Sequence, residues 1–156
     1  MDIRSKGGYP SSALSNFAPH PFVLDGIQIS SMEGFLQSLK FDKPHIQVEV
    51  CKLTGFAAKK RGSARTKTWQ RIQKLWWNGQ IYDRHGEEYQ RLLDRAYAAL
   101  AENEKFKKAL LATGDAVLTH SLGHSNDKKT ILTEREFIRR LVSLRQVLQW
   151  QEMGES

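Results

Sequence analysis

The longest periodic segment of the chain, residues 86–103, limits what the rest of the sequence can fold into. Apolar residues recur along it at the spacing of one helix face: Tyr89, Leu92, Leu93, Ala96, Tyr97 and Leu100. This spacing predicts an amphipathic helix whose apolar stripe must pack against other elements. Asn103 is a suitable N-cap for a following helix over residues 104–112. The chain is therefore expected to build one core around the helix at 86–103.

Turn and cap signals predict a small β element followed by a helix. Asp25-Gly26 stands between two short apolar runs within residues 22–29, which is the pattern of a two-residue hairpin. Ser30 and Glu33 have the spacing of a capping box, so a helix is expected over residues 31–41.

The remaining elements are predicted from weaker signals. They are short helices over residues 45–53, 56–62 and 68–77, a short strand over 116–119, and a C-terminal helix that opens at the capping box Thr133-x-x-Glu136. Gly62 is expected to end the second of these helices as its C-cap. Residues 120–130 are rich in Gly, Ser, Asn, Asp and Lys, so they are expected to form a surface loop.

Length and composition are those of a globular protein. The chain has 156 residues, of which 40% are hydrophobic and 26% charged, so one domain over residues 1–156 is expected. The predicted elements give an α+β fold that is predominantly α, with a single compact helical domain and a small β-hairpin element.

Several features exclude other classes of protein. No apolar run approaches the roughly 20 residues of a membrane span, so no membrane contact is expected. Residues 1–6 lack the apolar region of a secretory signal, and the single cysteine, Cys51, excludes an internal disulfide. His120 and His124 lie in a predicted loop without an acidic partner at metalloprotease spacing. We therefore expect a cytoplasmic protein with no metal ion and no other cofactor.

The net charge of +7 is concentrated in residues 59–74, which contain seven basic residues and no acid. The basic residues are Lys59, Lys60, Arg61, Arg65, Lys67, Arg71 and Lys74. They could neutralise the phosphates of a single-stranded nucleic acid while Trp69 stacks on a base. A solvated helix face explains the same run equally well. Trp76 and Trp77 are interpreted as one core and one surface residue rather than as a base-stacking pair.

Three polar residues of the predicted helix at 31–41 share one stripe. Glu33, Gln37 and Lys40 stand at positions i, i+4 and i+7, and could present a carboxylate, an amide and an amine to one substrate. Phe35, Leu36 and Leu39 lie away from this stripe and can anchor the helix in the core. In the alternative interpretation, Glu33 is only a helix cap and Lys40 its solvated neighbour.

The order of these motifs resembles the N-terminal signature of the NADAR superfamily of N-glycosidases, which are YbiA-like. The signature consists of a Ser-Asn-Phe segment, a hairpin with Asp-Gly, and the pattern S-x-E-x-x-x-Q-x-x-K-F. Here these elements are residues 14–18, Asp25-Gly26 and residues 31–41. Residues 57–62 resemble the family's A-x-x-x-G segment, and residues 103–115 resemble its "KF…LL-x-TG" segment.

The resemblance implies cleavage of a bond between ribose C1′ and a nitrogen. One branch of the family hydrolyses ribosylaminopyrimidine phosphates of riboflavin biosynthesis, and another removes ADP-ribose from guanine in nucleic acid. By motif, Glu33 would be the general acid or base, and Lys40 the amine next to the sugar, where it could form a Schiff base. Further substrate contacts are expected from Asn16, Phe17, Gln37, Lys59, Arg61, Gly62, Trp69, Ser121, Gly123 and Asp127.

One departure from the family pattern bears on the substrate. The riboflavin branch has a W-G-D-G-G loop before its last helix, whereas residues 121–129 of this chain contain no tryptophan, and an extra segment occupies residues 76–81. We therefore expect ADP-ribosylated guanine in nucleic acid as the preferred substrate, with a DNA ADP-ribosyltransferase toxin as functional partner. The alternatives are a ribosyl-phosphate intermediate of riboflavin biosynthesis and a module that binds ADP-ribose without turnover.

Overall fold

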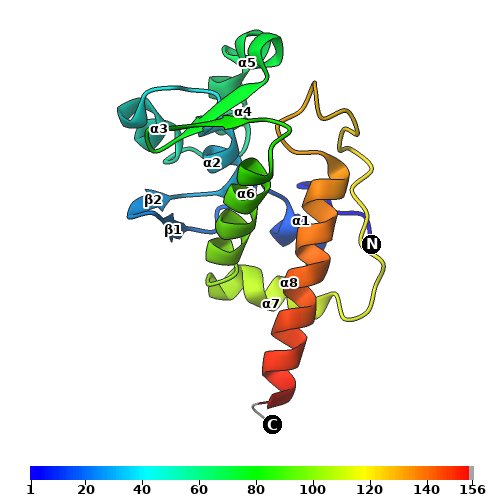
Figure 1. Cartoon of the computed structure of the whole chain (residues 1–156). Helices are drawn as coiled ribbons and strands as arrows, with labels where there is room; N and C mark the ends of the chain where they lie inside the picture. The colour runs from blue at the N-terminus through cyan, green and yellow to red at the C-terminus, as the bar shows by residue number, and fades with distance from the viewer. Residues whose placement is uncertain (155–156) are drawn as a thin grey trace.

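The structure is a computed structural model that describes residues 1–154, and its centre is the predicted amphipathic helix (Figure 1). This helix, α6 (Glu87–Leu100), buries Tyr89, Leu92, Leu93, Ala96, Tyr97 and Leu100. It lies beside the long C-terminal helix α8 (Glu134–Gly154), while α7 (Glu104–Ala112) contacts α8 and the short α1 (Ser11–Leu14). The Asn103 side chain accepts hydrogen bonds from the backbone of Lys105 and Phe106, so the predicted N-cap is confirmed.

Helix α2 (Met32–Ser38) packs between this core and two further helices, α3 (Pro44–Val50) and α4 (Gly55–Ser63). The predicted capping box at Ser30 and Glu33 is wrong by one residue, because Ser31 is the N-cap and its Oγ accepts from the Gly34 N–H at 3.1 Å. The α-helix also ends earlier than predicted. Residues 39–41 continue it with hydrogen bonds to the third residue back, as in a 3₁₀ turn.

The predicted hairpin is confirmed, and a second one was missed. Strands β1 (Phe22–Leu24) and β2 (Ile27–Ile29) pair antiparallel across Asp25 and Gly26, both with positive φ. Residues 68–77 were predicted to be one helix, but α5 (Thr66–Ile72) ends before β3 (Lys74–Trp77), which pairs with β4 (Gln80–Asp83).

The second hairpin turns at Asn78 and Gly79, which also have positive φ and form a turn suited to tight hairpins. Trp77 is 1% exposed, and its indole N–H donates to the Asp25 carboxylate at 2.9 Å, which joins the two hairpins. Trp76 is only half-buried, so the interpretation of one core and one surface tryptophan is confirmed.

Other predicted boundaries need smaller corrections. Pro44 begins α3 at its first turn rather than only ending the preceding helix. Gly62 lies inside α4, so its prediction as a C-cap is wrong. Residues 116–119 form no strand beyond a single bridge between Thr119 and Asp2. The second capping box is confirmed, because Thr133 and Glu136 exchange hydrogen bonds between side chain and backbone at 2.8 and 3.1 Å.

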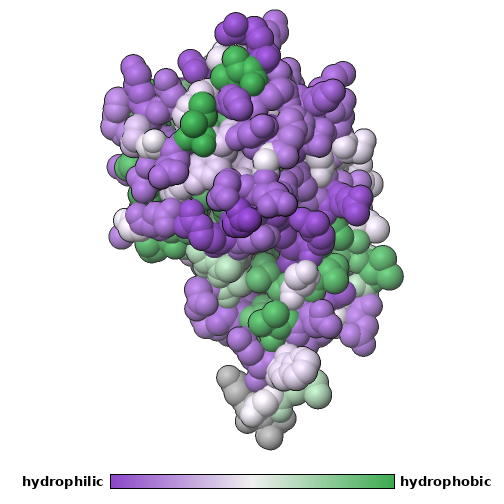
Figure 2. Space-filling view, viewed as in Figure 1, coloured by the Kyte–Doolittle hydropathy of each residue, from purple (hydrophilic) through white to green (hydrophobic). Residues whose placement is uncertain are grey.

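The fold is therefore α+β and mainly helical, as predicted, with two small antiparallel hairpins instead of one. On the face seen in Figure 2, hydrophilic residues dominate the upper part, and apolar residues gather lower down, around α7 and α8. Within residues 1–154, no helix combines the length and apolar character needed to cross a bilayer.

Candidate active site

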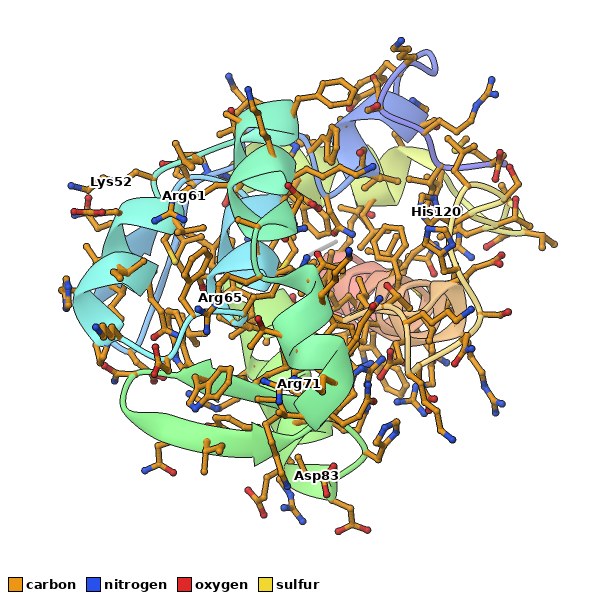
Figure 3. All side chains as sticks on the ribbon, turned by 90° about the horizontal axis from the view of Figure 1, so that it is seen from above. Lys52, Arg61, Arg65, Arg71, Asp83 and His120 are labelled. Atoms are coloured by element: carbon orange, nitrogen blue, oxygen red, sulfur yellow. The ribbon has the colours of Figure 1, made fainter. Side chains whose placement is uncertain are left out.

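A cavity of about 350 Å³ opens between α2, α4, α5 and the loop of residues 120–133. Most of the predicted site residues line it: Asn16, Phe17, Glu33, Gln37, Lys40, Lys59, Trp69 and Gly123. Figure 3 looks down on this region, with α4 and α5 on one side and His120, from the loop, on the other. The cavity brings together segments that are more than one hundred residues apart in the sequence.

Helix α2 supplies the reactive groups of the cavity. The spacing of Glu33, Gln37 and Lys40 places all three along the same wall. Leu36 was predicted to lie away from this stripe, but it lines the cavity between the polar residues. Phe35, by contrast, is fully buried and anchors the opposite side of the helix in the core.

The Gln37 amide is held in place by Glu33 on one side and by Gly62 of α4 on the other. Its Nε2 donates to Glu33 Oε1 at 2.8 Å, while its own Oε1 is buried without a hydrogen-bond partner. A Cβ on Gly62 would lie 1.8 Å from that Oε1, so only glycine lets α4 approach the amide so closely. Gly62 thus shapes the wall behind Gln37 and does not itself line the cavity.

The Glu33 carboxyl group and the Lys40 amine are both buried, and burial disfavours their charged forms. Burial raises the pKa of Glu33, against the opposing effects of the Gln37 hydrogen bond and of the positive charges on Lys40 and Lys59. Lys40 is 7% exposed, and burial, reinforced by the charge of Lys59, lowers its pKa to about 8 even though Glu33 opposes the shift. A substantial fraction of Lys40 is therefore neutral near pH 8, and its Nζ donates to Thr66 Oγ1 at 3.1 Å.

The Ser-Asn-Phe segment is tied to both α2 and the core helix. The Asn16 carbonyl accepts from the Glu33 N–H at 2.9 Å, and its side-chain Oδ1 accepts from the Tyr97 hydroxyl at 2.7 Å. Because Tyr97 belongs to α6, the central helix fixes the Asn16 amide at the edge of the cavity. The NH₂ group of Asn16 donates to no other group within residues 1–154, and is thus free to bind a substrate oxygen.

The loop that closes the cavity is anchored by side chains from α5 and from the two residues that flank the second hairpin, Gln73 and Arg84. Gln70 and Gln73 donate to the backbone carbonyls of Lys129 and Lys128 at 2.9 Å each. Arg84, fully buried, donates to the Thr130 carbonyl at 3.0 Å and forms an ion pair with Glu136 at 2.7 Å. The missed hairpin therefore has a structural role at the site, because it holds the loop over the cavity.

His120 lines the cavity although it was not among the substrate contacts predicted from the sequence. Its Nδ1 is 2.8 Å from the Ile3 carbonyl, which can only accept, so this nitrogen carries the proton. Its ring packs edge-to-face on Phe137 at 5.2 Å between centroids. In the neutral ring, Nε2 is then the hydrogen-bond acceptor. The only sequence signal was the pairing with His124, which pointed toward a metal.

Residues 8–146 match a protein family described as bacteriophage protein GP30.3. The chain belongs to the GP30.3 family. It is 41% identical over 150 residues, 95% of its length, to an uncharacterized 17.1 kDa protein from the Gp30–rIII intergenic region of Enterobacteria phage T4, and covers 98% of that protein.

The fold of this GP30.3-family chain is also that of the Escherichia coli protein YbiA, whose structure was determined by NMR. The two superpose with a TM-score of 0.62 over 98% of this chain and 86% of YbiA, at 21% sequence identity. The YbiA-like fold expected from the NADAR resemblance is thereby confirmed. At this identity the likeness concerns the fold alone.

Other predicted contacts of this GP30.3-family chain lie outside the cavity lining. The Arg61 guanidinium stacks on the Phe41 ring, 4.5 Å from its centroid. Ser121 donates from both its backbone and its hydroxyl to the Asp2 carboxylate, and Asp127 lies 3.4 Å from His85. Arg61 thus covers the Phe41 ring, whereas Ser121 and Asp127 make contacts that hold their loop.

The basic run at residues 59–74 does not form one continuous surface. Lys59 faces the cavity, whereas Figure 3 shows Arg61, Arg65 and Arg71 on the side of α4 and α5 away from His120. Trp69 is fully buried, so it is not available as an exposed stacking ring, although it lines the cavity and its buried indole N–H lacks a partner.

Proposed function

We propose that this protein is an N-glycosidase that hydrolyses the bond between ribose C1 and a nitrogen base, with ADP-ribosylated guanine in nucleic acid as preferred substrate. The observation that carries the proposal is the meeting, in one cavity, of a carboxyl group with a raised pKa and a lysine with a pKa of about 8. Such perturbed pairs in a cleft are typical of catalytic sites. The YbiA-like fold and the order of the motifs agree with this assignment.

Lys40 is the nucleophile in the proposed reaction. A ribosylamine opens to an imine between C1 and the base nitrogen, and the neutral Lys40 amine adds to C1. The base amine then leaves with a proton, so that the C1–N bond to the base is replaced by a Schiff base to Lys40. Water adds to that Schiff base, and releases the sugar with its aldehyde carbon and the free lysine.

Proton transfer is assigned to Glu33 and His120. A carboxyl group whose pKa is raised by burial can protonate the leaving nitrogen and later take a proton from the attacking water. The His120 side chain lines the same cavity, and its unprotonated Nε2 is assigned as the second base. Asn16 is assigned to orient a sugar oxygen, because its amide donors are free and its position is fixed by Tyr97.

A change at Lys59 tests the proposed use of a neutral lysine. The charge of Lys59 lowers the pKa of both Lys40 and Glu33, so Lys59→Met should raise both. Activity should rise with pH as Lys40 loses its proton. In the variant, this rise in activity should occur at higher pH, so activity at pH 7 should be several-fold lower than in the wild type. The pH dependence of kcat/KM measures the shift. Lys60→Met, at an exposed neighbouring position, is the control; superimposable profiles for Lys59→Met and the wild type would refute the coupling.

The preference for nucleic acid is tested on the exposed part of the basic run. Lys67 and Arg71 are exposed on α5 and touch no part of the cavity. If they hold a strand, the double change to Ala should weaken cleavage of an ADP-ribosylated oligonucleotide. The slope of log affinity against log salt concentration should also become shallower, by about 0.7 for each phosphate contact that is lost. Cleavage of a ribosylaminopyrimidine phosphate should stay near the wild-type rate. An unchanged salt slope on the oligonucleotide would contradict binding of the strand by this surface.

A further inference from the structure

The last turns of α8 carry an exposed apolar surface, and in Figure 1 they project beyond the other elements. Trp150 is 77% exposed and Val147 is 53% exposed, whereas the three other tryptophans are buried or half-buried. Residues 137–151 contain three arginines but no lysine and no acidic residue. Tryptophan and arginine are enriched in protein–protein interfaces, and lysine, aspartate and glutamate are depleted there. This helix therefore has the composition of a surface that another protein covers.

A hollow of about 320 Å³ opens along α8, where it packs beside α6. The hollow is lined by residues of both helices: Asp94, Tyr97, Arg139, Arg140, Ser143 and Leu144. Ser143 and Trp150 are seven residues apart, or two helical turns, so they share one face and lie about 10 Å apart along the axis. Val147 stands between them on this face. The exposed tryptophan and the hollow thus belong to the same surface.

The walls of the hollow are held by hydrogen bonds and an ion pair. The Arg140 guanidinium is buried, donates to the Gln90 carbonyl at 3.0 Å and lies 3.0 Å from the Asp94 carboxylate. The Tyr97 hydroxyl donates to Asn16, so Tyr97 presents only its ring to the hollow. The hollow therefore keeps its shape before a partner arrives, which lowers the entropic cost of filling it.

The groups around the hollow suit an indole ring. The Asp94 side chain is 65% exposed, and its second oxygen has no partner within residues 1–154, so it can accept an indole N–H. Arg139 is exposed and forms no ion pair in the part of the chain that the structure describes, so its guanidinium can lie against the ring. The Tyr97 ring and Leu144 give the hollow apolar walls.

A second copy of the chain supplies such an indole ring. When two α8 helices pack antiparallel about a two-fold axis beside Val147, Ser143 of each copy lies opposite Trp150 of the other. The tryptophan then enters the hollow at the small serine side chain, as a knob enters a hole between packed helices. Both contacts form together, because a two-fold axis makes the interface self-complementary.

The charges of the two helices also match in this arrangement. The last turn of α8 contains no basic residue, so no cation of its own turn offsets the partial negative charge of the C-terminal carbonyls. Antiparallel packing places this turn opposite Arg139 of the second copy, which lies four residues before Ser143. Each copy thereby supplies the cation that the end of the other helix lacks.

We propose that this face of α8 is the interface of a homodimer, in which Trp150 of each copy fills the hollow between α6 and α8 of the other. The hollow shares no lining residue with the candidate active site. The inference is therefore independent of the proposed function.

Sedimentation equilibrium over a range of protein concentrations tests the interface. The wild-type protein should pass from monomer to dimer. Trp150→Ala should weaken dimerisation by at least about 10²-fold, because each dimer loses two buried tryptophans. Ser143→Arg should have a similar effect, since it fills the hollow from an exposed position. The control is Ile81→Ala, which removes a 62% exposed apolar side chain from β4 and should leave dimerisation unchanged.

A 1:1 mixture of the two variants tests the pairing of tryptophan with hollow. The Ser143→Arg copy keeps its tryptophan and the Trp150→Ala copy keeps an open hollow, so one of the two contacts can form. The mixture should therefore dimerise more strongly than either variant alone, and less strongly than the wild type.

A cysteine near the two-fold axis tests the orientation of the helices. Cys51 is the only cysteine and is buried, so it does not compete for cross-linking. Oxidation should link two copies of Val147→Cys rapidly, whereas Val117→Cys, at an exposed position outside the interface, should link far more slowly.

A wild-type protein that stays monomeric up to about 1 mM would overturn the proposal, and would leave a different protein as the occupant of this face. So would a Trp150→Ala variant that dimerises like the wild type, a mixture that associates no better than its two components, or equal cross-linking at positions 147 and 117.

Discussion

Replacing Lys40 with methionine is expected to abolish turnover and, at the same time, to stabilise the fold. Turnover should fall by at least about 10³-fold, since the amine is proposed to form the bond to C1. Burial lowers the pKa of Lys40 from 10.5 to about 8, so the folded state disfavours the charged form. This penalty is fully present below pH 8 and disappears as the pH rises toward 10.5; at pH 7 it is on the order of 3 kcal/mol.

The stability gain follows from removing that penalty with a side chain of similar length. The loss of the hydrogen bond to Thr66 reduces this gain. The free energy of unfolding should therefore increase by about 1–3 kcal/mol at pH 7, and by less at pH 10. Urea unfolding at the two pH values measures it. Lys52→Met, at an exposed position, is the control and should change neither stability nor turnover. A variant that is less stable at pH 7 than the wild type would contradict the lowered pKa of Lys40.

Borohydride trapping examines the covalent step separately. Reduction of the wild-type protein during turnover should attach the sugar irreversibly to Lys40, and Lys40→Met should give no adduct. If the wild-type protein turns over substrate without any adduct, Lys40 acts only through its charge.

Glu33→Gln is expected to lower kcat by roughly 10²–10⁴-fold while substrate binding persists. The amide keeps an oxygen that can accept from Gln37, and the N-cap of α2 is Ser31, so the helix loses no cap. Burial raises the pKa of Glu33, so the folded state gains nothing from its charge at neutral pH, and a neutral amide should not destabilise the protein.

Single-turnover cleavage and equilibrium binding, measured side by side, distinguish an enzyme from a module that only binds. The control is Glu49→Gln, an exposed carboxylate on α3. An enzyme loses turnover and keeps its affinity for substrate, whereas a binding module has no turnover to lose. Cleavage at the wild-type rate by Glu33→Gln would remove this residue from the mechanism.

Local signals in the sequence were sufficient for much of the fold. The spacing of apolar residues located α6, and short caps and turns located α7, β1, β2 and the start of α8. These features depend on hydrogen bonds and faces within a few residues. The second hairpin was missed because residues 68–77 were treated as one helical segment, although Asn78-Gly79 is as strong a turn signal as Asp25-Gly26.

The candidate site was predictable to the extent that it lies on one helix. Glu33, Gln37 and Lys40 share a face by spacing alone, and the structure places all three on one cavity wall. Contacts between distant segments were not predictable from the sequence. The close approach of Gly62 to Gln37 and the orientation of His120 by the Ile3 carbonyl both depend on how α4 and the N-terminal segment pack in the fold.

The same limit applies to the basic run, because its spacing in the sequence does not show which of its side chains share a surface. Helical spacing separates Lys59 from Arg61 by about 200° around the axis, so one faces the cavity and the other covers Phe41. Trp69 is buried between α5 and the cavity, which a polar sequence neighbourhood does not reveal.

The central claim is cleavage of the bond between ribose and base, and the mass of the products tests it most directly. The wild-type protein is incubated with an oligonucleotide that carries one ADP-ribosylated guanine, and both the strand and the released fragment are weighed by mass spectrometry. The account predicts that the strand returns to the mass of its unmodified form while intact ADP-ribose appears. A strand that keeps its modification, or one that keeps a ribose phosphate after cleavage within the diphosphate, would contradict it.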